Sequence, residues 1–355
     1  PLPVVEYACR HVGESVHLSH MQVETVAIAM SALLRRGARG RTFALGDGTG
    51  LGKGRCLAAI AREWHGHHGV DGRVLWVSAN LRLGEQTIDE LRLFLDDNQD
   101  TRWFRFESYM RLKNVGVRDE CISWIQQSTQ GSTAASTARV LVCLDECHLL
   151  RRRKLLFRAI AEILQTVPGV AVLYSSATMM SDPSHMLYLS QRLPMYRGAD
   201  APFENPKHMQ RVLNTGGTAV LELVAMYLRS QGVYVARQLS LHGVDVDSWR
   251  FAATWQHRQL YDLLARSIVE CGVPQTRAQH VILRLIAALK VARAIDHADV
   301  FLKRGWSVIF SLARTGEATT ERNIERGARC PTSCVDDFAR YLAHHGLVGP
   351  FDRNA

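Results

Sequence analysis

The chain has 355 residues, of which 47% are hydrophobic and 22% are charged, so it is long enough for two globular domains with hydrophobic cores. No apolar stretch reaches the length of a membrane span, and the first residues lack the pattern of a signal peptide, which argues against a membrane-spanning or secreted protein. The formal net charge of +9 favours a polyanionic partner such as nucleic acid. Because the sequence begins with Pro1 rather than Met, we expect it to be part of a longer chain.

A glycine-rich run, residues 46–55, lies between a strand-like and a helix-like segment. Residues 41–45 are typical of a short strand, and residues 56–61 begin an apolar helical pattern. In this strand, loop and helix order, backbone N–H groups can surround a phosphate while a lysine, here Lys53, approaches the outer phosphates. The glycines that we expect to shape this loop are Gly48, Gly50 and Gly52.

The run departs from the usual phosphate-loop pattern at two positions. Asp47 stands where that pattern has its first glycine, and Gly54 replaces the hydroxyl residue that normally contacts Mg²⁺. From this run alone, a turn that leads into a helix and binds no ligand is an alternative interpretation.

An acidic pair follows the next strongly apolar segment. Residues 140–144 form a continuous apolar run, typical of a buried parallel strand, and Asp145 and Glu146 come directly after it. Two adjacent carboxylates at such a position are unfavourable unless a cation or a proton uses them. In a nucleoside triphosphatase, Asp145 would hold Mg²⁺ and Glu146 would orient and deprotonate the attacking water. The alternative is a pair of carboxylates that faces solvent.

Hydroxyl residues follow a third strand-like segment. Residues 170–174 are apolar and lead into the stretch 175–178, which contains Ser176 and Thr178. Hydroxyl groups at this position would be placed to couple the state of a bound phosphate to a neighbouring domain. A simple turn or helix cap is the alternative.

In this order, the three segments resemble the core of a superfamily 2 helicase or translocase, and in detail the strawberry notch family. The phosphate loop of that family has the form G-D-G-x-G-x-G-K-G-R, which residues 46–55 match, including the glycine after the lysine. Its D-E-C-H motif matches residues 145–148, and its S-A-T motif matches residues 176–178. Further similar segments are residues 18–24, 232–240 and 314–318.

The resemblance implies ATP and Mg²⁺ as cofactors. It makes Lys53, Asp145 and Glu146 the catalytic residues, with Asp145 as the Mg²⁺ ligand, and it assigns Gln22 to recognition of adenine. The residues that it places around the nucleotide are Gln22, Gly48, Thr49, Gly50, Gly52, Lys53, Gly54 and Arg55. The residues that it expects to couple nucleotide state to the rest of the motor are Ser176, Ala177 and Thr178.

The resemblance also predicts the domain organisation. Alternating strand-like and helix-like runs over residues 1–200 indicate a parallel α/β sheet, which would be a RecA-like ATP-binding domain. Residues 201–304 are mainly helical in pattern. Residues 305–355, with a strand-like run at 306–310, would be the incomplete start of a second RecA-like domain.

In this architecture, the loops after the non-catalytic strands face the nucleic acid. The residues that we expect there are Ser78, Asn80, Ser108 and Tyr109. Their polar groups suit phosphate contacts that do not distinguish bases, so the partner is DNA or RNA. The basic run 151–154 is a further candidate, with a solvated helix face as the alternative.

An incomplete second domain affects the expected activity. Superfamily 2 motors hydrolyse ATP between two RecA-like domains, and the second domain supplies arginines that stabilise the transition state. We therefore expect this chain to bind ATP but to hydrolyse it slowly, unless a second chain or a protein partner completes the motor.

Together, these features predict an ATP-dependent helicase or translocase that acts on nucleic acid. The alternatives are a non-hydrolysing scaffold that keeps the helicase fold, and a transcription or chromatin regulator that binds nucleotide, protein or nucleic acid. The eight scattered cysteines indicate a reducing compartment, so we expect an intracellular protein, nuclear or cytoplasmic.

Overall fold

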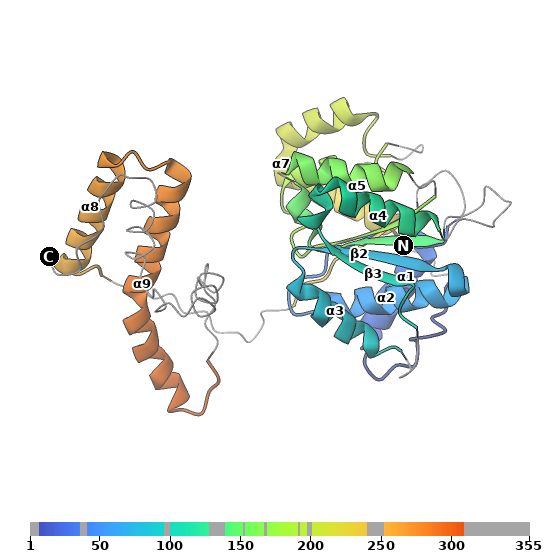
Figure 1. The fold of residues 1–355 in the computed structure, drawn as a ribbon, viewed down its shortest axis with the longest axis horizontal. Coiled ribbons are helices and arrows are strands. Elements are labelled where there is room, and N and C mark those ends of the chain that lie inside the picture. The colour runs from blue at the N-terminus through green and yellow to red at the C-terminus, as the bar shows by residue number, and fades with distance from the viewer. Residues whose placement is uncertain are drawn as a thin grey trace. The chain divides into compact units, whose positions relative to one another are not determined.

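The structure is a computed structural model. It describes residues 7–35, 41–95, 100–127, 139–151, 153–166, 169–190, 192–196, 201–239 and 252–308. Contacts within the chain define two compact units, Pro1–His242 and Gly243–Ala355. The first unit carries a β-sheet and the second carries two long helices (Figure 1).

The described part of the first unit contains a parallel sheet of six strands in the order β3-β2-β4-β5-β1-β6. The strands are β1 (Thr42–Leu45), β2 (Arg73–Ser78), β3 (Phe104–Ser108), β4 (Val140–Leu144), β5 (Ala171–Ser175) and β6 (Tyr234–Val235). Every residue of β1, β4 and β5 is buried, as expected for central strands of a parallel sheet with both faces covered.

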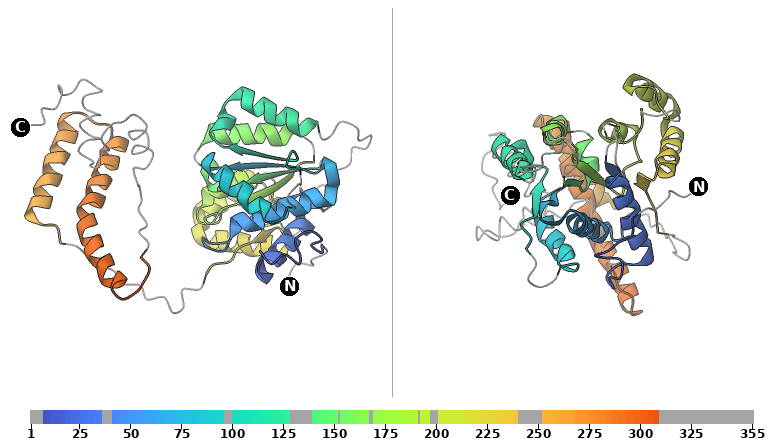
Figure 2. Two further views of the ribbon diagram at one scale, coloured as in Figure 1. Left: turned by 60° about the horizontal axis from the view of Figure 1, so that its bottom comes forward. Right: turned by 90° about the vertical axis from the view of Figure 1, so that its right-hand side faces the viewer.

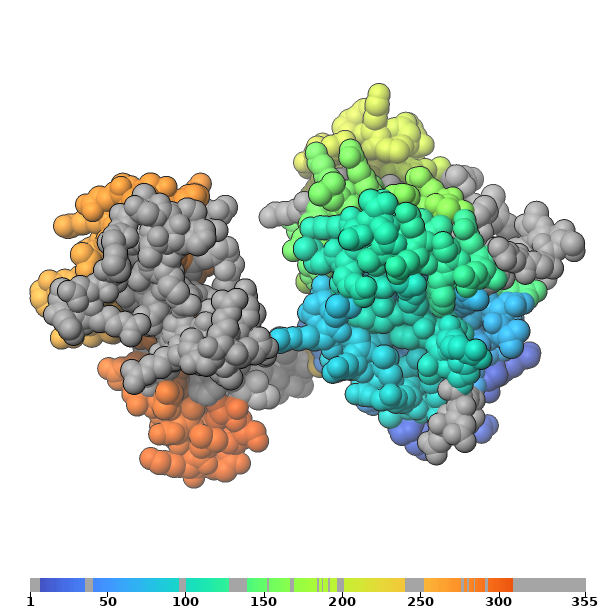
Figure 3. Space-filling view, in the orientation of Figure 1, coloured from blue at the N-terminus to red at the C-terminus, as the bar shows by residue number. Residues whose placement is uncertain are grey.

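Helices cover both faces of this sheet. The α-helices are α1 (His20–Leu33), α2 (Lys53–His68), α3 (Arg82–Arg92), α4 (Val115–Gln126), α5 (Lys154–Thr166), α6 (Met186–Leu189) and α7 (Pro206–Ser230). Short 3₁₀ helices are η1 (Gly69–Asp71), η2 (Arg111–Lys113), η3 (Cys147–Leu150) and η4 (Pro183–His185). Figures 1 and 2 show α1, α2 and α3 on one face and α4 and α5 on the other. In the space-filling view, the segment from β3 to α4 forms the middle of the visible face of this unit (Figure 3).

Polar side chains define where several helices begin. Ser19 and Gln22 form a capping box at the start of α1. Asn114 caps α4 by accepting hydrogen bonds from the backbone N–H groups of Gly116 and Val117. Asn205 caps α7 in the same way, and Pro206 occupies the first helical position, where its missing N–H has no intrahelical partner to lose.

The register of the central strands brings their carboxyl ends to one edge of the sheet. Strand β5 lies between β1 and β4, with Leu45 of β1 level with Ser175 and Leu144 of β4 level with Tyr174. The residue after Leu144 is Asp145, so the acidic pair and the glycine-rich loop start at the same edge. Ligands of open α/β sheets bind at this edge, outside the carboxyl ends of the strands.

A buried carboxylate attaches the first described residues to α2. Glu63 of α2 has no solvent exposure and accepts hydrogen bonds from Tyr7 Oη (2.7 Å), His11 N (2.7 Å) and Val12 N (2.9 Å). A buried charge needs such partners, because transfer of an unpaired carboxylate out of water is strongly unfavourable. Glu63 therefore fixes the segment that precedes α1.

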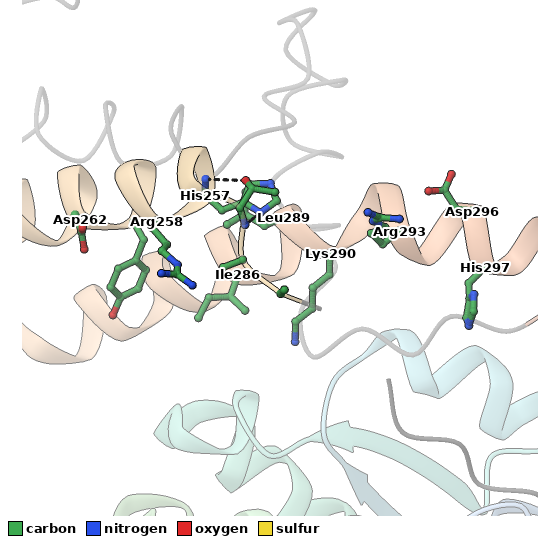
Figure 4. Close-up of a pocket in the computed structure, with 13 residues that line it drawn as sticks. His257, Arg258, Asp262, Ile286, Leu289, Lys290, Arg293, Asp296 and His297 are labelled. Carbon is green, nitrogen blue, oxygen red and sulfur yellow. Dashed lines mark hydrogen bonds between the residues drawn. The ribbon is translucent and has the colours of Figure 1, made fainter. Parts of the chain in front are cut away.

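The described part of the second unit contains α8 (Trp255–Glu270) and α9 (Gln275–Leu302). Ile268 lies at the centre of their small hydrophobic core. A cavity of about 790 Å³ is lined by residues of both helices, and Figure 4 shows basic side chains beside it. The charged lining residues are Arg258, Asp262, Lys290, Arg293 and Asp296, and this mixture of signs does not select one kind of ligand.

The predicted fold class, a RecA-like parallel α/β sheet followed by a mainly helical region, is confirmed for the described residues. A strand was expected over residues 306–310. Residues 306–308 belong to no helix or strand, and residues 309–310 lie outside the described residues. The second RecA-like domain over 305–355 therefore stays a prediction. The expected domain limits also stay predictions. The compact unit that ends at His242 includes α7 and β6, which follow the expected limit of the first domain at residue 200.

Candidate functional site

The glycine-rich loop connects β1 to the start of α2. Gly50 (φ +85°) and Gly52 (φ +74°) adopt left-handed backbone conformations that glycine enters without strain. Gly52 is the N-cap of α2. The unpaired N–H groups of the first helical turn and the positive end of the helix dipole are therefore at the loop. Lys53 is the first residue of α2, and its Nζ donates to Gly48 O at 3.0 Å. These features would suit a bound anion, and phosphate binding at this loop stays a prediction.

Gln22 lies directly against this loop. Its Oε1 accepts from Ser19 N at 2.9 Å, and its Nε2 donates to Leu51 O at 3.2 Å. A Cβ atom at position 52 would lie 2.5 Å from Gln22 Nε2, so a side chain there would displace the Gln22 amide from Leu51 O as well as strain the backbone. Helix α1 therefore supports the loop through Gln22, for which the family resemblance implies recognition of adenine.

Asp145 follows β4 and is half-buried. Its Oδ2 accepts a hydrogen bond from Ser78 Oγ at 2.9 Å. Burial, and secondarily the negative charge of Glu146, raise the pKa of Asp145, which means that its environment favours the neutral form. A cation beside it would restore the charged form.

The donor set fits Mg²⁺. Within the described part of the chain, neither Asp145 nor Glu146 forms an ion pair with lysine or arginine. The same part of the chain has no cluster of three or more His, Cys, Asp or Glu that could hold a metal ion on its own. Mg²⁺ is typically held by one or two carboxylates together with phosphate oxygens of the substrate, and the carboxylate of Asp145, at the same sheet edge as the glycine-rich loop, matches that pattern.

Glu146 has an unusual backbone conformation. It is the one non-glycine residue with positive φ (+49°) in the described part of the chain. This conformation costs a non-glycine residue about 1–2 kcal/mol, so the surrounding contacts must impose it. The turn at Glu146 leads into η3 and brings His148 back toward its carboxylate.

His148 connects the acidic motif to the hydroxyl residues after β5. Its Nδ1 lies 3.1 Å from Glu146 Oε2 and 3.0 Å from Oγ of the buried Ser176. Ser176 Oγ in turn accepts a hydrogen bond from Thr178 N at 3.2 Å. Sequence reasoning gave His148 no separate role, although its place in the D-E-C-H motif was a signal. Ala177, between the two hydroxyl residues, is half-buried.

Three further residues of the glycine-rich run differ in their surroundings. Arg55 points to α3, where its Nε forms an ion pair with Glu90 Oε2 at 2.9 Å. Thr49 is exposed at the tip of the loop, and a Cβ at Gly54 would meet no atom within 4 Å. Thr49 and Gly54 are therefore open to a ligand, whereas the guanidinium of Arg55 already has a partner.

The four residues expected to contact nucleic acid are not equally accessible. Ser78 and Ser108 are buried, and Tyr109 is only 1% exposed within the hydrophobic core. Asn80 is exposed, and its Oδ1 accepts from Leu83 N at 3.2 Å at the start of α3. Of the four, only Asn80 presents its side chain at the surface, because the strand-end hydroxyls turn inward.

The site also contains an ion pair that the sequence did not indicate. Asp47 is 2% exposed, and its Oδ1 accepts from Arg237 N at 2.9 Å and Arg237 Nε at 3.4 Å. These residues are 190 positions apart, so no local pattern could pair them. Asp47 is thus a paired structural group of the loop rather than a departure that weakens it.

Comparison with known proteins finds a matching protein family and several similar proteins. The model of a family described as P-loop containing NTP hydrolase pore-1 matches residues 1–100 and 105–263. The chain is 27% identical to Protein FORGETTER 1 of Arabidopsis thaliana, over 87% of this chain and 27% of that protein. It is 27% identical to Protein strawberry notch homolog 2 of Mus musculus (87% and 25%) and 26% identical to Protein strawberry notch of Drosophila melanogaster (88% and 22%). The predicted resemblance to the strawberry notch family is confirmed, and the chain spans about a quarter of the length of these relatives.

Among solved structures, the chain is similar to the Sulfolobus solfataricus SWI2/SNF2 ATPase core in complex with dsDNA. The sequence identity is 12% and the TM-score is 0.44, over 88% of this chain and 66% of that one.

Proposed function

Because the chain belongs to the P-loop containing NTP hydrolase pore-1 family, we propose that it binds ATP with Mg²⁺ and hydrolyses the bond between the β- and γ-phosphates. The observation that carries this proposal is the meeting of two groups at one sheet edge. The anion-binding loop before α2 and the Asp145–Glu146 pair follow strands whose ends are level through β5. Phosphoryl transfer needs these two groups close together, one for the phosphates and one for the metal and water.

Each residue has a role in this proposal that follows from its position. The N–H groups at the start of α2 and the ammonium of Lys53 bind the phosphates. Asp145 holds Mg²⁺, which when bound would neutralise charge on the phosphate oxygens. Glu146 accepts a proton from the attacking water. Gln22, whose Nε2 donates to Leu51 O of the loop, is proposed to contact adenine.

We further propose that the reaction drives a helicase or translocase that acts on DNA or RNA. The net charge of +9 supports a polyanionic partner, and the exposed Asn80 after β2 offers a polar contact at the sheet edge. The contacts from His148 to Ser176 provide a path from the nucleotide to the rest of the molecule. Transition-state arginines would come from a second RecA-like domain, in this chain or in a partner, so slow basal turnover is expected.

We also propose that the protein is intracellular. Six cysteines of the described residues are free thiols, which favours a reducing, intracellular environment. No helix that the structure describes is long and apolar enough to cross a bilayer.

Nucleotide binding tests the first step of this function. We expect a fluorescent ATP analogue to bind in the presence of Mg²⁺, and Lys53→Ala to weaken binding about tenfold or more because one ammonium contact to phosphate is lost. The matched control is Lys113→Ala, which removes an exposed lysine from η2, away from the loop. Equal affinities for the unsubstituted chain and Lys53→Ala would contradict the assigned phosphate site.

A further inference from the structure

A segment far along the chain continues the sheet over the phosphate loop. We call residues 233–239 the strap. Ala44 N donates to Val233 O (2.9 Å), Gly46 N to Val235 O (2.7 Å) and Gly48 N to Arg237 O (2.7 Å). These bonds come from every second residue, as in the parallel pairing of β1 with β6, and they continue that pairing past the end of β1 into the loop.

These bonds divide the loop into two halves. The N–H groups of Gly46 and Gly48 are already used by the strap, so they are not available for a phosphate. The anion-binding N–H groups must therefore come from the second half of the loop and the first turn of α2. The first half serves to hold the second half in place.

Close packing reinforces this pairing. A Cβ at position 46 would lie 2.6 Å from Tyr234 Oη, and one at position 50 would lie 3.1 Å from Leu239 Cδ1. The strap therefore fills the space that side chains would occupy on one side of the loop. Glycine at position 46 leaves room for Tyr234, and glycine at position 50 leaves room for Leu239.

One side chain of the strap connects the loop to α1. Besides its two bonds to Asp47, Arg237 donates through Nη1 to Met21 O at 2.9 Å and through Nη2 to Thr25 Oγ1. In α1, Met21 directly precedes Gln22 and Thr25 follows it by three residues, and Gln22 contacts the loop at Leu51. The Asp47 carboxylate is buried and depends on this guanidinium for its charge compensation.

We propose that Arg237 is a positioning residue for the nucleotide. Through Asp47 and α1, it holds the phosphate loop in the conformation that accepts phosphates, although it does not itself touch the nucleotide. This inference rests on the proposed binding of ATP at the loop. Because coupling between two sites is reciprocal, bound ATP should also hold the strap more firmly.

The test compares Arg237→Gln, Asp47→Asn and the double variant with the unsubstituted chain. Affinity for a fluorescent ATP analogue with Mg²⁺ is measured, together with hydrogen exchange of the amides of Gly46 and Gly48. Each single variant should weaken ATP binding about tenfold, a typical coupling between linked groups, and the double variant should be little worse than either. Exchange at Gly46 and Gly48 should become faster in Arg237→Gln, and Arg237→Lys should retain part of the affinity.

Arg35 provides the matched control. Its Nη1 donates to Gln231 O at 2.7 Å, so it contacts the chain just before the strap but not the loop. Arg35→Gln should leave both ATP affinity and exchange in the loop unchanged. Circular dichroism and thermal unfolding verify that every variant is folded.

The outcomes separate this inference from the proposed function. If the unsubstituted chain binds ATP and Arg237→Gln binds it equally well, with unchanged exchange in the loop, the positioning role is overturned and the proposed function stands. If the unsubstituted chain itself binds no ATP, the proposed function fails and the nucleotide role of Arg237 fails with it. A loss that Arg35→Gln shares equally would also overturn the role, because the effect would then not come from the loop.

Discussion

His148 Nδ1 lies 3.0 Å from Ser176 Oγ, and this contact joins the acidic motif after β4 to the hydroxyl residues after β5. The same nitrogen lies 3.1 Å from Glu146 Oε2. A single side chain thus contacts the carboxylate proposed to activate water and the serine proposed to transmit nucleotide state. A displacement of Glu146 during hydrolysis would be transmitted to β5 through this imidazole.

His148→Ala is expected to uncouple the two motifs. Turnover stimulated by nucleic acid should fall about tenfold, a typical coupling between linked sites, while the KM for ATP changes little because no phosphate contact is lost. Steady-state kinetics with and without single-stranded DNA or RNA measure the effect. Ser176→Ala should show the same pattern, and a change in KM alone would contradict the role.

Glu63→Leu is expected to destabilise the first unit by about 3 kcal/mol, because the hydroxyl of Tyr7 and the backbone N–H groups of His11 and Val12 would lose their buried acceptor. Chemical denaturation followed by circular dichroism measures the free energy of unfolding. Glu90→Leu is the control, since it removes only the partly exposed ion pair with Arg55 and should cost less than about 1 kcal/mol. Equal effects of the two variants would refute the anchoring role of Glu63.

Gly52→Ala and Gly54→Ala should differ strongly, although only one residue separates them. At position 52, the left-handed backbone and the 2.5 Å approach to Gln22 Nε2 should cost about 1–2 kcal/mol of stability and reduce ATP affinity. At position 54, in the first turn of α2, a methyl group meets nothing within 4 Å, so stability should stay equal or rise by about 0.5 kcal/mol. Thermal unfolding and ATP titration of both variants measure this contrast.

Asp145→Asn is expected to stabilise the chain at neutral pH while it abolishes turnover. Burial raises the folded-state pKa of Asp145 above the unfolded value, so the folded state favours the proton. The ionised group therefore lowers stability at pH values above the folded pKa, and this penalty disappears as the pH falls below the unfolded pKa. The gain in Tm from Asp145→Asn should accordingly shrink in acid. The exposed Asp89 is the control position, where Asp89→Asn should show no such pH-dependent gain.

Local patterns in the sequence predicted the parts of the site that are contiguous in the chain. The strand, loop and helix around Lys53 are specified by neighbouring residues, and the apolar run before Asp145 is typical of a central strand. The burial of Ser78 and Tyr109 was not predictable, because a polar residue at a strand end can turn toward the core or toward solvent. The pairing of Asp47 with Arg237 depends on β6 joining the sheet beside β1, which no local spacing indicates.

Steady-state ATP hydrolysis by the chain and by Glu146→Gln, with and without single-stranded DNA or RNA, distinguishes an ATPase from a nucleotide-binding scaffold. We expect slow turnover that nucleic acid stimulates, and we expect Glu146→Gln to bind ATP normally but to lose hydrolysis because the general base is absent. ATP binding without turnover, under every condition and also after addition of a second RecA-like domain, would contradict the proposed hydrolysis. The chain would then be a nucleotide-binding scaffold rather than an ATPase.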